Sequence, residues 1–469
     1  MDEMKNIETN VAILGGGPAG YVAAIRAAQL GAEVVLVEER ELGGVCLNRG
    51  CIPTKTLLRN SELAYSFKKS KEFGMQIDNL QIDWSSAWSR KERVVKNLRM
   101  GLEKLIATNK ITLLQGKGTI ISPQELVVTT VDNNIKVSCR SLLITVGSEA
   151  AVPDIPGIHL PGVMNSDVAL DLQEIPPSLV IIGAGAIGLE FADMFNGMGT
   201  KVTVLELEDR ILPAEDKDIS EELLKVLKRH GIAFKLGVRV NEIREKNGTL
   251  EVSISEKGKE TLYNAEKVLV AVGRKLRSAT HDIMNLGIDI NEHGAIVVNE
   301  QMRTNLDGVY AAGDVIGGKL LAHLAFAEGR VAVENALGMK TKLNYDAVPT
   351  CVYTHPELAS VGINEQEAGK RGLPVRVGRF DFRQNGRALA MGERDGFVKI
   401  VINAEDHVVL GGQILGAQAS EMISELTLAV TLGVKVEILA DMIHPHPTLS
   451  EAVMEACGDA VGRSIHKLK

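Results

Sequence analysis

The sequence of 469 residues has few cysteines and few aromatic residues: five cysteines, and 4% Phe, Trp and Tyr together. Five cysteines are too few for a disulfide framework in a chain of this length. No apolar run is long enough to span a bilayer, and the N-terminus, Met1-Asp2-Glu3-Met4-Lys5-Asn6, is polar and does not resemble a signal peptide. We therefore expect a cytoplasmic protein with no membrane partner, in which any cysteine pair that bonds is catalytic rather than structural.

Basic residues are also in deficit, with 52 Lys and Arg against 60 Asp and Glu, a formal net charge of -8 and a pI near 5.8. This balance argues against nucleic acid as a partner. The hydrophobic fraction of 45% and the charged fraction of 24% are typical of globular proteins. The 46 glycines indicate many strand-to-helix turns and phosphate-binding loops, and the length suggests three or four domains.

Two of the cysteines stand close together in the stretch Gly43-Gly44-Val45-Cys46-Leu47-Asn48-Arg49-Gly50-Cys51-Ile52-Pro53-Thr54-Lys55. On a regular helix, at about 1.5 Å rise per residue, their Cα atoms would lie further apart than the roughly 7 Å a disulfide tolerates. A local distortion is needed, and Gly50 supplies the freedom for it. Pro53 fits the first turn of a following helix. The pair is either a redox-active dithiol facing a flavin or two buried cysteines that never meet.

A dinucleotide-binding pattern precedes this stretch. Residues 10–14 form a short apolar strand, followed by Gly15-Gly16-Gly17-Pro18-Ala19-Gly20, an Ala-rich helix through Leu30, and a strand ending in Glu38. In such a fingerprint Gly15 makes the turn, Gly17 allows close approach of the diphosphate and Gly20 allows close helix–strand packing. Glu38 stands where an acid accepts hydrogen bonds from ribose hydroxyls, so the pattern predicts a bound dinucleotide.

The same pattern occurs a second time. A strand at residues 179–182 leads into Gly183-Ala184-Gly185-Ala186-Ile187-Gly188, a helix over residues 189–198, and a strand ending in Glu206. Two copies of the pattern predict two bound dinucleotides. Glu206 would hold a free 2′-hydroxyl and repel a 2′-phosphate, so the second unit is expected to prefer NAD over NADP. Arg210 lies close enough in the sequence to leave the NADP alternative open.

The remaining segments predict the domain organisation. Residues 87–106 carry an apolar stripe at helical spacing: Val94, Val95, Leu98, Leu102, Leu105 and Ile106. A loop with Pro153, Pro156 and Pro161 marks a domain boundary. We expect an α/β protein with two Rossmann-like domains and a C-terminal mixed α/β domain. The expected parts are 1–150 with the dithiol, 151–279 for NAD, 280–347 returning to the first domain, and 348–469 for dimerisation.

The C-terminal part has no nucleotide fingerprint. Alternating apolar residues at 375–382, 396–402 and 407–414 predict an antiparallel sheet, and helices are expected at 420–432 and 449–456. A mixed α/β module of this kind is a candidate subunit interface.

Near the end of the chain stands His444-Pro445-His446-Pro447-Thr448-Leu449-Ser450-Glu451. A histidine held in one tautomer by a carboxylate is a general base near neutral pH, and His446 with Glu451 fits this role for a dithiol. The alternatives are two loop histidines followed by a helix-capping glutamate, or metal binding by the His444/His446 pair. No cysteine or acid cluster completes a metal-ligand set, so no metal is expected.

Together these motifs resemble the pyridine nucleotide-disulfide oxidoreductases over nearly the whole chain. Residues 43–55 are similar to the family's redox motif, Ala311-Ala312-Gly313-Asp314 to its second FAD-binding signature, and His446-Pro447-Thr448-Leu449 with Glu451 to its base motif. The form Cys-Leu-Asn-x-Gly-Cys-Ile-Pro-Thr-Lys is closest to the branch that oxidises dihydrolipoyl groups. Departures from the usual pattern occur at Val146, Leu276 and Leu324.

The resemblance implies a role for each catalytic position. Cys46 would exchange with the substrate, and Cys51, nearer the flavin, would form the charge-transfer thiolate. Lys55 would pair with Glu190 beside the flavin. His446, oriented by Glu451, would act on the cysteines of the other subunit, so each active site of a homodimer would be shared.

The resemblance also implies the cofactors and partners. Asp314 would hold the ribityl chain of FAD. The residues expected to contact FAD are Gly15, Gly17, Pro18, Ala19, Gly20, Glu38, Gly44, Lys55, Gly147, Ser148, Asp314, Ala322 and His323; those for NAD are Gly183, Gly185, Gly188, Glu206 and Gly273. The substrate would arrive on a lipoyl-bearing acyltransferase or lipoyl protein of a 2-oxo acid dehydrogenase complex or the glycine cleavage system. A reductase of another small disulfide and a non-catalytic flavoprotein scaffold are the alternatives.

Overall fold

The computed structural model describes residues 5–256 and 258–468. The chain divides into two compact units, each built from several segments. Unit 1 comprises Met1–Thr56, Trp88–Ala151 and Arg274–Leu343, and unit 2 comprises Leu57–Ala87, Val152–Gly273 and Asn344–Lys469. Residues 57–87 thus belong to unit 2, although the sequence places them within the expected first domain.

Unit 1 is built on a seven-stranded sheet in the order β3-β2-β1-β6-β5-β4, with β17 beside β6. β1, β2, β3, β6 and β17 run parallel where they pair, and β4 and β5 are antiparallel additions. The strands are β1 (Lys5–Leu14), β2 (Val34–Glu38), β3 (Thr112–Gln115), β4 (Lys117–Ser122), β5 (Glu125–Thr129), β6 (Asn134–Ile144) and β17 (Val309–Ala311). β1 begins five residues earlier than the sequence predicts, because Lys5–Thr9 pair with β6.

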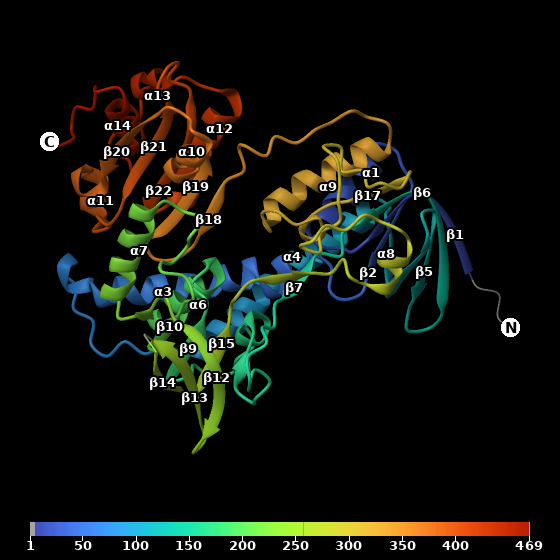
Figure 1. The fold of residues 1–469 in the computed structure, drawn as a ribbon, viewed down its shortest axis with the longest axis horizontal. Helices are drawn as coiled ribbons and strands as arrows, with labels where there is room; N and C mark the ends of the chain where they lie inside the picture. Colours follow the sequence, from blue (N-terminus) through green and yellow to red (C-terminus); the bar gives the residue numbers. More distant parts are fainter. Residues whose placement is uncertain (1–4, 257, 469) are drawn as a thin grey trace. The chain divides into compact units, whose positions relative to one another are not determined.

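Two helices of unit 1 pack together near this sheet, α1 (Pro18–Gln29) and α9 (Ala322–Ala336) (Figure 1). A Cβ on Gly329 of α9 would lie only 2.2 Å from the Ala19 carbonyl oxygen, so this glycine permits the close contact. The other elements of unit 1 are α8 (His281–Asn285), η2 (Asp314–Ile316) and the paired strands β7 (Ser148–Ala150) and β16 (Arg274–Leu276). Residues 274–343 lie in the same compact unit as β1 and α1; the sequence predicts that residues 280–347 return to the first domain.

Two helices cross from a segment of one unit into a segment of the other, α3 (Cys51–Lys68) and α4 (Trp84–Thr108), and α2 (Gly44–Arg49) precedes α3 within unit 1. The apolar stripe predicted for α4 is only partly correct. Val95, Leu102 and Ile106 are buried, whereas Leu98 and Leu105 are 47% and 51% exposed. A helical period fixes which residues share a face but not how wide a band of that face is covered.

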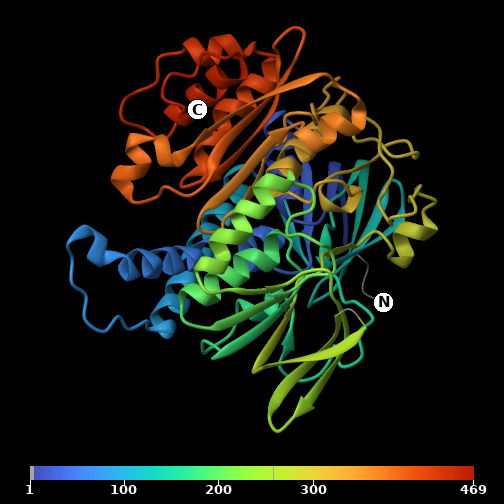
Figure 2. The ribbon, with the colours of Figure 1, turned by 60° about the vertical axis from the view of Figure 1, so that its left-hand side comes forward.

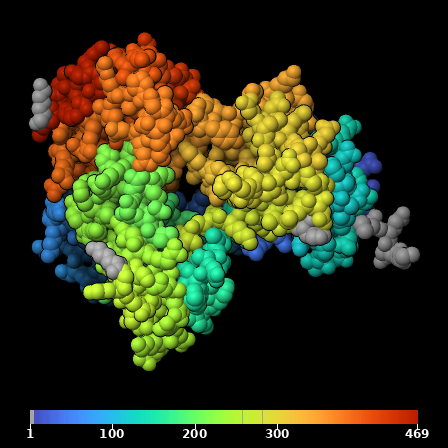
Figure 3. All heavy atoms as spheres, viewed as in Figure 1, coloured from blue at the N-terminus to red at the C-terminus, as the bar shows by residue number. Residues whose placement is uncertain are grey.

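Unit 2 contains the second parallel sheet, in the order β11-β10-β9-β15-β8. Its elements are β8 (Val163–Met164), α5 (Ser166–Ala169), β9 (Ser178–Ile182), α6 (Ala186–Gly197), β10 (Lys201–Leu205), α7 (Lys217–Arg229), β11 (Ala233–Lys235) and β15 (Lys267–Val270), with η1 (Ser70–Phe73) from the earlier segment. The strand expected at 268–273 ends at Val270, three residues early. A separate antiparallel sheet, β12 (Arg239–Lys246), β13 (Thr249–Glu256) and β14 (Lys259–Ala265), forms the yellow-green projection in Figure 3.

The C-terminal part of unit 2 has a five-stranded antiparallel sheet in the order β18-β19-β22-β21-β20, as the alternation of apolar residues predicts. Apolar residues of α12 and α14 share one buried cluster with the sheet, and Figure 2 shows the red helices over the orange strands. The elements are β18 (Thr350–Val352), β19 (Glu357–Gly362), α10 (Glu365–Arg371), β20 (Val375–Asp381), η3 (Phe382–Gln384), α11 (Gly386–Met391), β21 (Phe397–Asn403), β22 (Val409–Gly416), α12 (Ala419–Leu432), α13 (Val436–Asp441) and α14 (Glu451–Ala460).

Candidate functional site

The first glycine-rich loop joins β1 to α1 in unit 1. Gly15 has φ +109°, which L side chains rarely adopt, and a Cβ on Gly20 would lie 1.8 Å from the Gly15 carbonyl oxygen. Gly17 is the N-cap of α1, and Pro18 occupies the first turn, where its missing N–H costs little. Ala19 follows in the same turn and is buried. The backbone of this turn therefore requires the glycines where the fingerprint has them.

Glu38 closes the first loop from the end of β2. Its carboxylate accepts hydrogen bonds from the backbone N–H of Gly16 at 2.7 Å and of Arg40 at 2.7 Å. This places the acid beside the glycine turn, where a ribose of a dinucleotide is expected. The N-terminus of α1 at this turn has the polarity that fits the diphosphate of FAD.

The cysteine stretch is attached directly to this loop. Gly43 N–H donates to the Gly16 carbonyl oxygen at 2.8 Å. Gly44 has φ +60°, and a Cβ there would lie 2.7 Å from Gly17 Cα. Only glycine fits at this contact, because the two backbones nearly touch. The dithiol segment is thereby held against the phosphate-binding turn.

Gly50 interrupts the helix between the two cysteines, as the spacing requires. α2 ends at Arg49, Gly50 has φ −145° and ψ −107°, and α3 begins at Cys51. The two thiols are hydrogen-bonded to each other. This hydrogen bond, together with burial, raises the pKa of Cys46 above its usual range, while the charge of Lys55 acts in the opposite direction. Cys46 and Cys51 therefore do meet, and the alternative of two distant buried cysteines is wrong.

Tyr21 on α1 is a neighbour of the dithiol that the sequence did not identify. Burial raises its pKa, and the charge of a Cys46 thiolate adds to the effect. Its ring centroid lies 5.8 Å from that of Phe326 on α9. The only sequence signal is its position directly after Gly20, on the helix that starts at the phosphate loop.

A polar network on the other side of the first loop joins Ser148, Arg274 and Asp314. Ser148 Oγ donates to Asp314 at 2.5 Å, and Arg274 Nε donates to Ser148 Oγ at 2.7 Å. Arg274 also lies 3.8 Å from the Asp314 carboxylate. Sequence analysis singled out Ser148 and Asp314 but assigned no role to Arg274, whose only signal was its position after Gly273.

The turn that carries Asp314 is fixed from α9. Gly313 has φ +76°, and its N–H donates to the buried carboxylate of Glu328 at 2.9 Å. Gly147, with φ +72°, leads into Ser148. Ala322 begins α9, and His323 follows it with an exposed side chain. Gly147, Ser148, Asp314, Ala322 and His323 belong to the expected FAD set and lie in unit 1, whereas the sequence did not reveal Glu328.

The second glycine-rich loop, between β9 and α6 in unit 2, repeats this geometry. Gly183 has φ +108°, and a Cβ on Gly188 would lie 2.1 Å from the Gly183 carbonyl oxygen. Glu206 accepts a hydrogen bond from Ala184 N–H at 2.5 Å and from Glu208 N–H at 2.9 Å. A Cβ on Gly185 would meet no atom within 4 Å, so the space over this loop is open for a diphosphate.

Glu190 and Gly273 complete the expected set in unit 2. Glu190 lies on α6, is 6% exposed, and accepts a hydrogen bond from Tyr353 N–H at 3.0 Å. Gly273 is the last residue of the segment Val152–Gly273 of unit 2 and has φ +127°, a conformation that favours glycine. Lys55 belongs to unit 1 and Glu190 to unit 2, so their pairing stays a prediction.

His446 lies in the loop before α14, also in unit 2. Its Nδ1 is 2.8 Å from Glu451 Oε1, and its side chain is 78% exposed. Burial acts to raise the pKa of Glu451, but hydrogen bonds from Thr448 N–H and His446 outweigh it, so that this pKa is below its usual value. An ionised Glu451 holds the proton of His446 on Nδ1 and leaves Nε2 to accept a proton. The pair has the geometry of an oriented general base.

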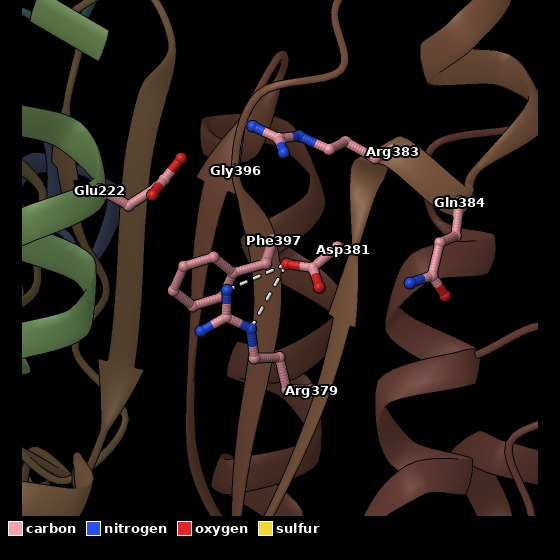
Figure 4. A pocket seen from close by; sticks show the side chains of 7 residues that line it. All are labelled: Glu222, Arg379, Asp381, Arg383, Gln384, Gly396 and Phe397. Carbon is pink, nitrogen blue, oxygen red and sulfur yellow. Dashed lines mark hydrogen bonds and ion pairs between the residues drawn. The ribbon is translucent and has the colours of Figure 1, made fainter. Parts of the chain in front are cut away.

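Figure 4 shows a pocket of about 240 Å³ that contains none of the predicted site residues. In it the Arg379 guanidinium lies 3.6 Å from the ring centroid of Phe397 and 2.9 Å from Asp381. The Arg379 guanidinium also lies 3.5 Å from the Asp218 carboxylate on α7, so it is surrounded by the side chains of three elements of unit 2. The remaining lining residues are Glu222, Arg383, Gln384 and Gly396.

Within residues 5–256 and 258–468, no helix combines the length and apolarity needed to cross a bilayer.

Comparison with known families identifies two matches: residues 9–329 match the pyridine nucleotide-disulphide oxidoreductase domain, and residues 348–457 match the dimerisation domain of the same family. The second match covers the antiparallel sheet and its helices.

Curated relatives match over nearly the whole chain. The dihydrolipoyl dehydrogenases of Chlamydia muridarum and Bacillus subtilis are each 40% identical, covering 97% and 98% of this chain and 97% and 99% of their own length. The mitochondrial dihydrolipoyl dehydrogenase of Pisum sativum is 39% identical over 98% of this chain and 93% of its own.

Solved structures agree with these matches. The HOCl-induced flavoprotein disulfide reductase of Escherichia coli, as its Cu(II) complex, has a TM-score of 0.87 and 31% identity, covering 96% of this chain and 99% of its own. LpdA from Mycobacterium tuberculosis has a TM-score of 0.89 and 26% identity, with the same coverage. The chain belongs to the pyridine nucleotide-disulphide oxidoreductases, a family of flavoprotein enzymes that use FAD and NAD.

Proposed function

We propose that this enzyme oxidises dihydrolipoyl groups carried on a partner protein, with NAD⁺ as the final acceptor. Per turnover, one dithiol becomes one disulfide, and NAD⁺ takes up a hydride while one proton is released. The observation that carries the proposal is the hydrogen-bonded pair Cys46 and Cys51, held against the phosphate-binding turn by Gly44. The curated relatives with 40% identity support the same substrate class.

The cysteines exchange disulfides with the substrate in two steps. A dihydrolipoyl thiolate attacks Cys46 Sγ of the oxidised pair, forming a mixed disulfide and releasing the Cys51 thiolate. The second substrate thiol then attacks the substrate sulfur of the mixed disulfide, closes the lipoyl ring and releases Cys46. Each attack needs a thiolate, and the raised pKa of Cys46 explains why a base is required to handle protons at this pair.

FAD supplies the two-electron chemistry that links the dithiol to NAD⁺ when it is bound. In this chain, the first loop with Glu38 would hold its diphosphate and ribose, and the Asp314, Ser148 and Arg274 network its ribityl region. Lys55 and Glu190 are proposed to pair beside it.

NAD⁺ would bind at the second loop, with Glu206 on the ribose hydroxyls. The Arg210 guanidinium is held by hydrogen bonds from Nη2 to the Pro213 carbonyl oxygen at 2.6 Å and to Gln366 at 2.7 Å, which leaves fewer of its donors for a 2′-phosphate. The carboxylate of Glu206 would also repel a phosphate there. Both observations favour NAD⁺ over NADP⁺.

The base His446 is proposed to serve the cysteines of a second copy of the chain. Its exposed side chain lies in the dimerisation domain, where large apolar residues are also exposed: Leu428 at 60%, Leu432 at 67%, Ile438 at 61% and Ile443 at 95%. Apolar residues exposed in this way mark an interaction surface. A homodimer would cover them and bring His446 to the other copy's dithiol.

A second candidate is the reduction of another small disulfide by a reduced pyridine nucleotide. The observation in its favour is the structural likeness to the Escherichia coli flavoprotein disulfide reductase. The physical chemistry of the cysteines is the same in both directions, so the substrate decides between the two.

The test is an assay of the purified protein with dihydrolipoamide and NAD⁺ against glutathione disulfide and NADPH. We expect turnover with the first pair only. Cys46→Ser and Cys51→Ser should each abolish it while FAD stays bound, because the isosteric hydroxyl cannot form a disulfide. Full activity in either variant would refute the dithiol role.

A further inference from the structure

The loop between α13 and α14 carries a second histidine, His444, two residues before the base. The two side chains have very different surroundings: that of His444 is 3% exposed, and that of His446 is 78% exposed. The His444 side chain is therefore buried inside the domain. Neither the role of a base nor substrate binding explains this burial.

Both ring nitrogens of His444 are engaged. Nδ1 lies 3.0 Å from the Met442 carbonyl oxygen, and Nε2 lies 3.0 Å from Glu425 Oε1. A carbonyl oxygen only accepts hydrogen bonds, so Nδ1 carries a proton. A second proton is then shared between Nε2 and the Glu425 carboxylate, which makes the pair an imidazolium facing a carboxylate. With both nitrogens used in this way, His444 is not available as a metal ligand.

The surrounding charges favour this protonated form. The hydrogen bond to Glu425 raises the pKa of His444 most strongly, burial opposes it, and the Met442 carbonyl group and the charges of Glu425 and Glu451 add to the rise. Glu425 faces the ring from α12, Glu451 from α14, and Met442 from the loop itself. The pair thus remains ionised over a wider pH range than an ordinary histidine would.

Glu425 lies on α12, which is packed into the core of the domain. Its neighbours on α12, Ile423 and Leu426, are buried in the apolar cluster that α12 shares with the sheet. The bond from His444 to Glu425 therefore links the start of the loop to a rigid element.

The other end of the loop is held separately. Thr448 N–H donates to Glu451 at 2.8 Å, and Asn385 Nδ2 donates to the Thr448 carbonyl oxygen at 3.0 Å. Thr448 Oγ1 also donates to the Pro445 carbonyl oxygen at 2.8 Å. His446 lies between these contacts and His444, so its placement depends on both.

We propose that His444, paired with Glu425, is a positioning residue that fixes the loop carrying the base His446. This inference rests on the proposed function, in which His446 handles the protons of the dithiol exchange. His444 itself touches neither substrate nor cofactor. Its effect is geometric, and a displacement of about 1 Å at a reacting group lowers the rate by as much as about 100-fold.

Two substitutions separate the two bonds of His444. The amide nitrogen of Gln lies near the Nε2 position of His, and that of Asn near the Nδ1 position. His444→Gln therefore retains the link to Glu425, while His444→Asn retains only the local link to Met442. We expect His444→Asn to lower kcat for dihydrolipoamide oxidation by about 10- to 100-fold and His444→Gln by less than about threefold, with KM nearly unchanged in both.

Two controls accompany these variants. Reduction of ferricyanide by NADH bypasses the dithiol and should be unchanged in both. His466→Asn removes a histidine that is also paired with a glutamate, Glu455, at 2.6 Å, but outside this loop. It should leave both activities at the wild-type level.

The pH profile gives a readout that loss of packing alone would not change. Because the pKa of His444 is raised in the folded protein, the ion pair is intact below that pKa and is lost as pH rises through it. The wild-type kcat should decrease there, and this decrease should be missing from His444→Gln, whose amide does not titrate. If His444→Asn does not fold, Glu425→Gln replaces it: loss of the carboxylate should move the decrease to lower pH.

Hydrogen exchange of the loop amides, followed by mass spectrometry, tests the inference without the lipoyl reaction. Exchange over residues 442–450 should be about tenfold faster in His444→Asn than in wild type or His444→Gln. Wild-type protein inactive on dihydrolipoamide, combined with faster exchange in His444→Asn, would refute the proposed function but support the loop's dependence on His444. Unchanged exchange, or unchanged kcat with an active wild type, would refute the inference.

Discussion

The two glycine-rich loops have nearly the same backbone and different surroundings. Gly15 and Gly183 have φ +109° and +108°, and a Cβ on Gly20 or Gly188 would in each case collide with the carbonyl oxygen of the first glycine. In both units an acid at the end of the second strand accepts a hydrogen bond from the second loop residue. The fingerprint therefore specifies a phosphate cradle and nothing about the chemistry beside it.

The two loops differ in what packs against them and in the side chains of the helix that follows. In unit 1 the Gly44 backbone lies over Gly17, whereas the equivalent space over Gly185 is empty. The helices differ too: α6 carries the buried acids Glu190 and Asp193 where the fingerprint alignment puts Val22 and Ile25 on α1. The two units thus share the backbone of the loop, and they differ in the inserted segment that carries Gly44 and in single side chains on the helix after the loop.

The largest expected effect comes from Gly20→Ala compared with Gly188→Ala. Each new Cβ would overlap a backbone oxygen, at 1.8 Å and 2.1 Å, and the overlap costs about 3 kcal/mol. That corresponds to about 100-fold in affinity. Gly20→Ala should purify with little FAD, whereas Gly188→Ala should retain FAD but need far more NADH, as flavin absorbance and the KM for NADH would show. Equal loss of FAD in both variants would mean that the two loops are not separate sites.

Gly44→Ala addresses the contact present in only one unit. The new Cβ, at 2.7 Å from Gly17 Cα and with φ +60°, should push the dithiol segment off the loop and lower dihydrolipoamide turnover about tenfold or more. Gly185→Ala is the matched variant, since its Cβ meets no atom within 4 Å. It should leave thermal stability unchanged and affect only the KM for NAD⁺. A Gly44→Ala enzyme with wild-type turnover would contradict the proposed positioning of the cysteines.

Asp193 makes the stability of unit 2 depend on pH. Its side chain is 2% exposed, and burial raises its pKa to about 8, with hydrogen bonds from Tyr65 and His355 N–H opposing the rise and the charge of Glu190 adding to it. The folded state keeps a proton that the unfolded chain loses near pH 4, so stability falls as pH rises between these values. Burial lowers the pKa of His230 to about 4, which gives the opposite slope below about pH 6.5.

From pH 6.5 to 8 the stability falls through Asp193 and, with the same sign, through His444, so the comparison of wild type with an Asp193 variant isolates Asp193. The free energy of unfolding, measured by denaturant titration, should fall by about 2 kcal/mol over this window in the wild type. Asp193→Asn should remove the part of the decrease that is due to Asp193, while Ile25→Asn in unit 1 should leave the pH slope as it is. A wild-type curve that is flat over the window would show that Asp193 is ionised in the folded protein.

Local patterns were sufficient to predict both parallel sheets, the antiparallel C-terminal sheet and the helix break at Gly50, because each follows from spacing and backbone freedom. Ser148 and Asp314 of the unit 1 network were expected only from the resemblance to the family, and neither source assigned a role to Arg274. Its role depends on β16 pairing with β7, a contact between residues more than a hundred positions apart that no local signal reveals. Glu328 was missed for the same reason, since it reaches the Gly313 turn from α9.

Burial was predicted less well than secondary structure. The apolar positions of α4 all have helical spacing, yet Leu98 and Leu105 are exposed. Spacing reports which residues share a face, and the packing partner decides how much of it is covered. Residues 57–87 illustrate the same limit, because membership of a compact unit is a property of tertiary contacts.

The smallest expected effect concerns the residue whose carbonyl oxygen lies against the first glycine of each loop. Thr145 and Ala271 occupy equivalent positions, because their carbonyl oxygens lie 2.4 Å and 2.5 Å from a Cβ built on Gly15 and Gly183. The single proton of Thr145 Oγ1 is shared between the Leu14 carbonyl oxygen at 3.0 Å and the Gly15 carbonyl oxygen at 2.8 Å, a contact that Ala271 cannot make. Thr145→Ala would make the first loop like the second and should cost about 1 kcal/mol in the free energy of unfolding.

Thr145→Ser is the matched control, since it keeps the hydroxyl and loses only a methyl group. Denaturant titrations of the apoprotein should place Thr145→Ser between wild type and Thr145→Ala. If the two variants are equally destabilised, the methyl group rather than the hydroxyl stabilises the turn. The hydroxyl would then not distinguish the first loop from the second, and that distinction would depend on Gly44 and on the acids of α6.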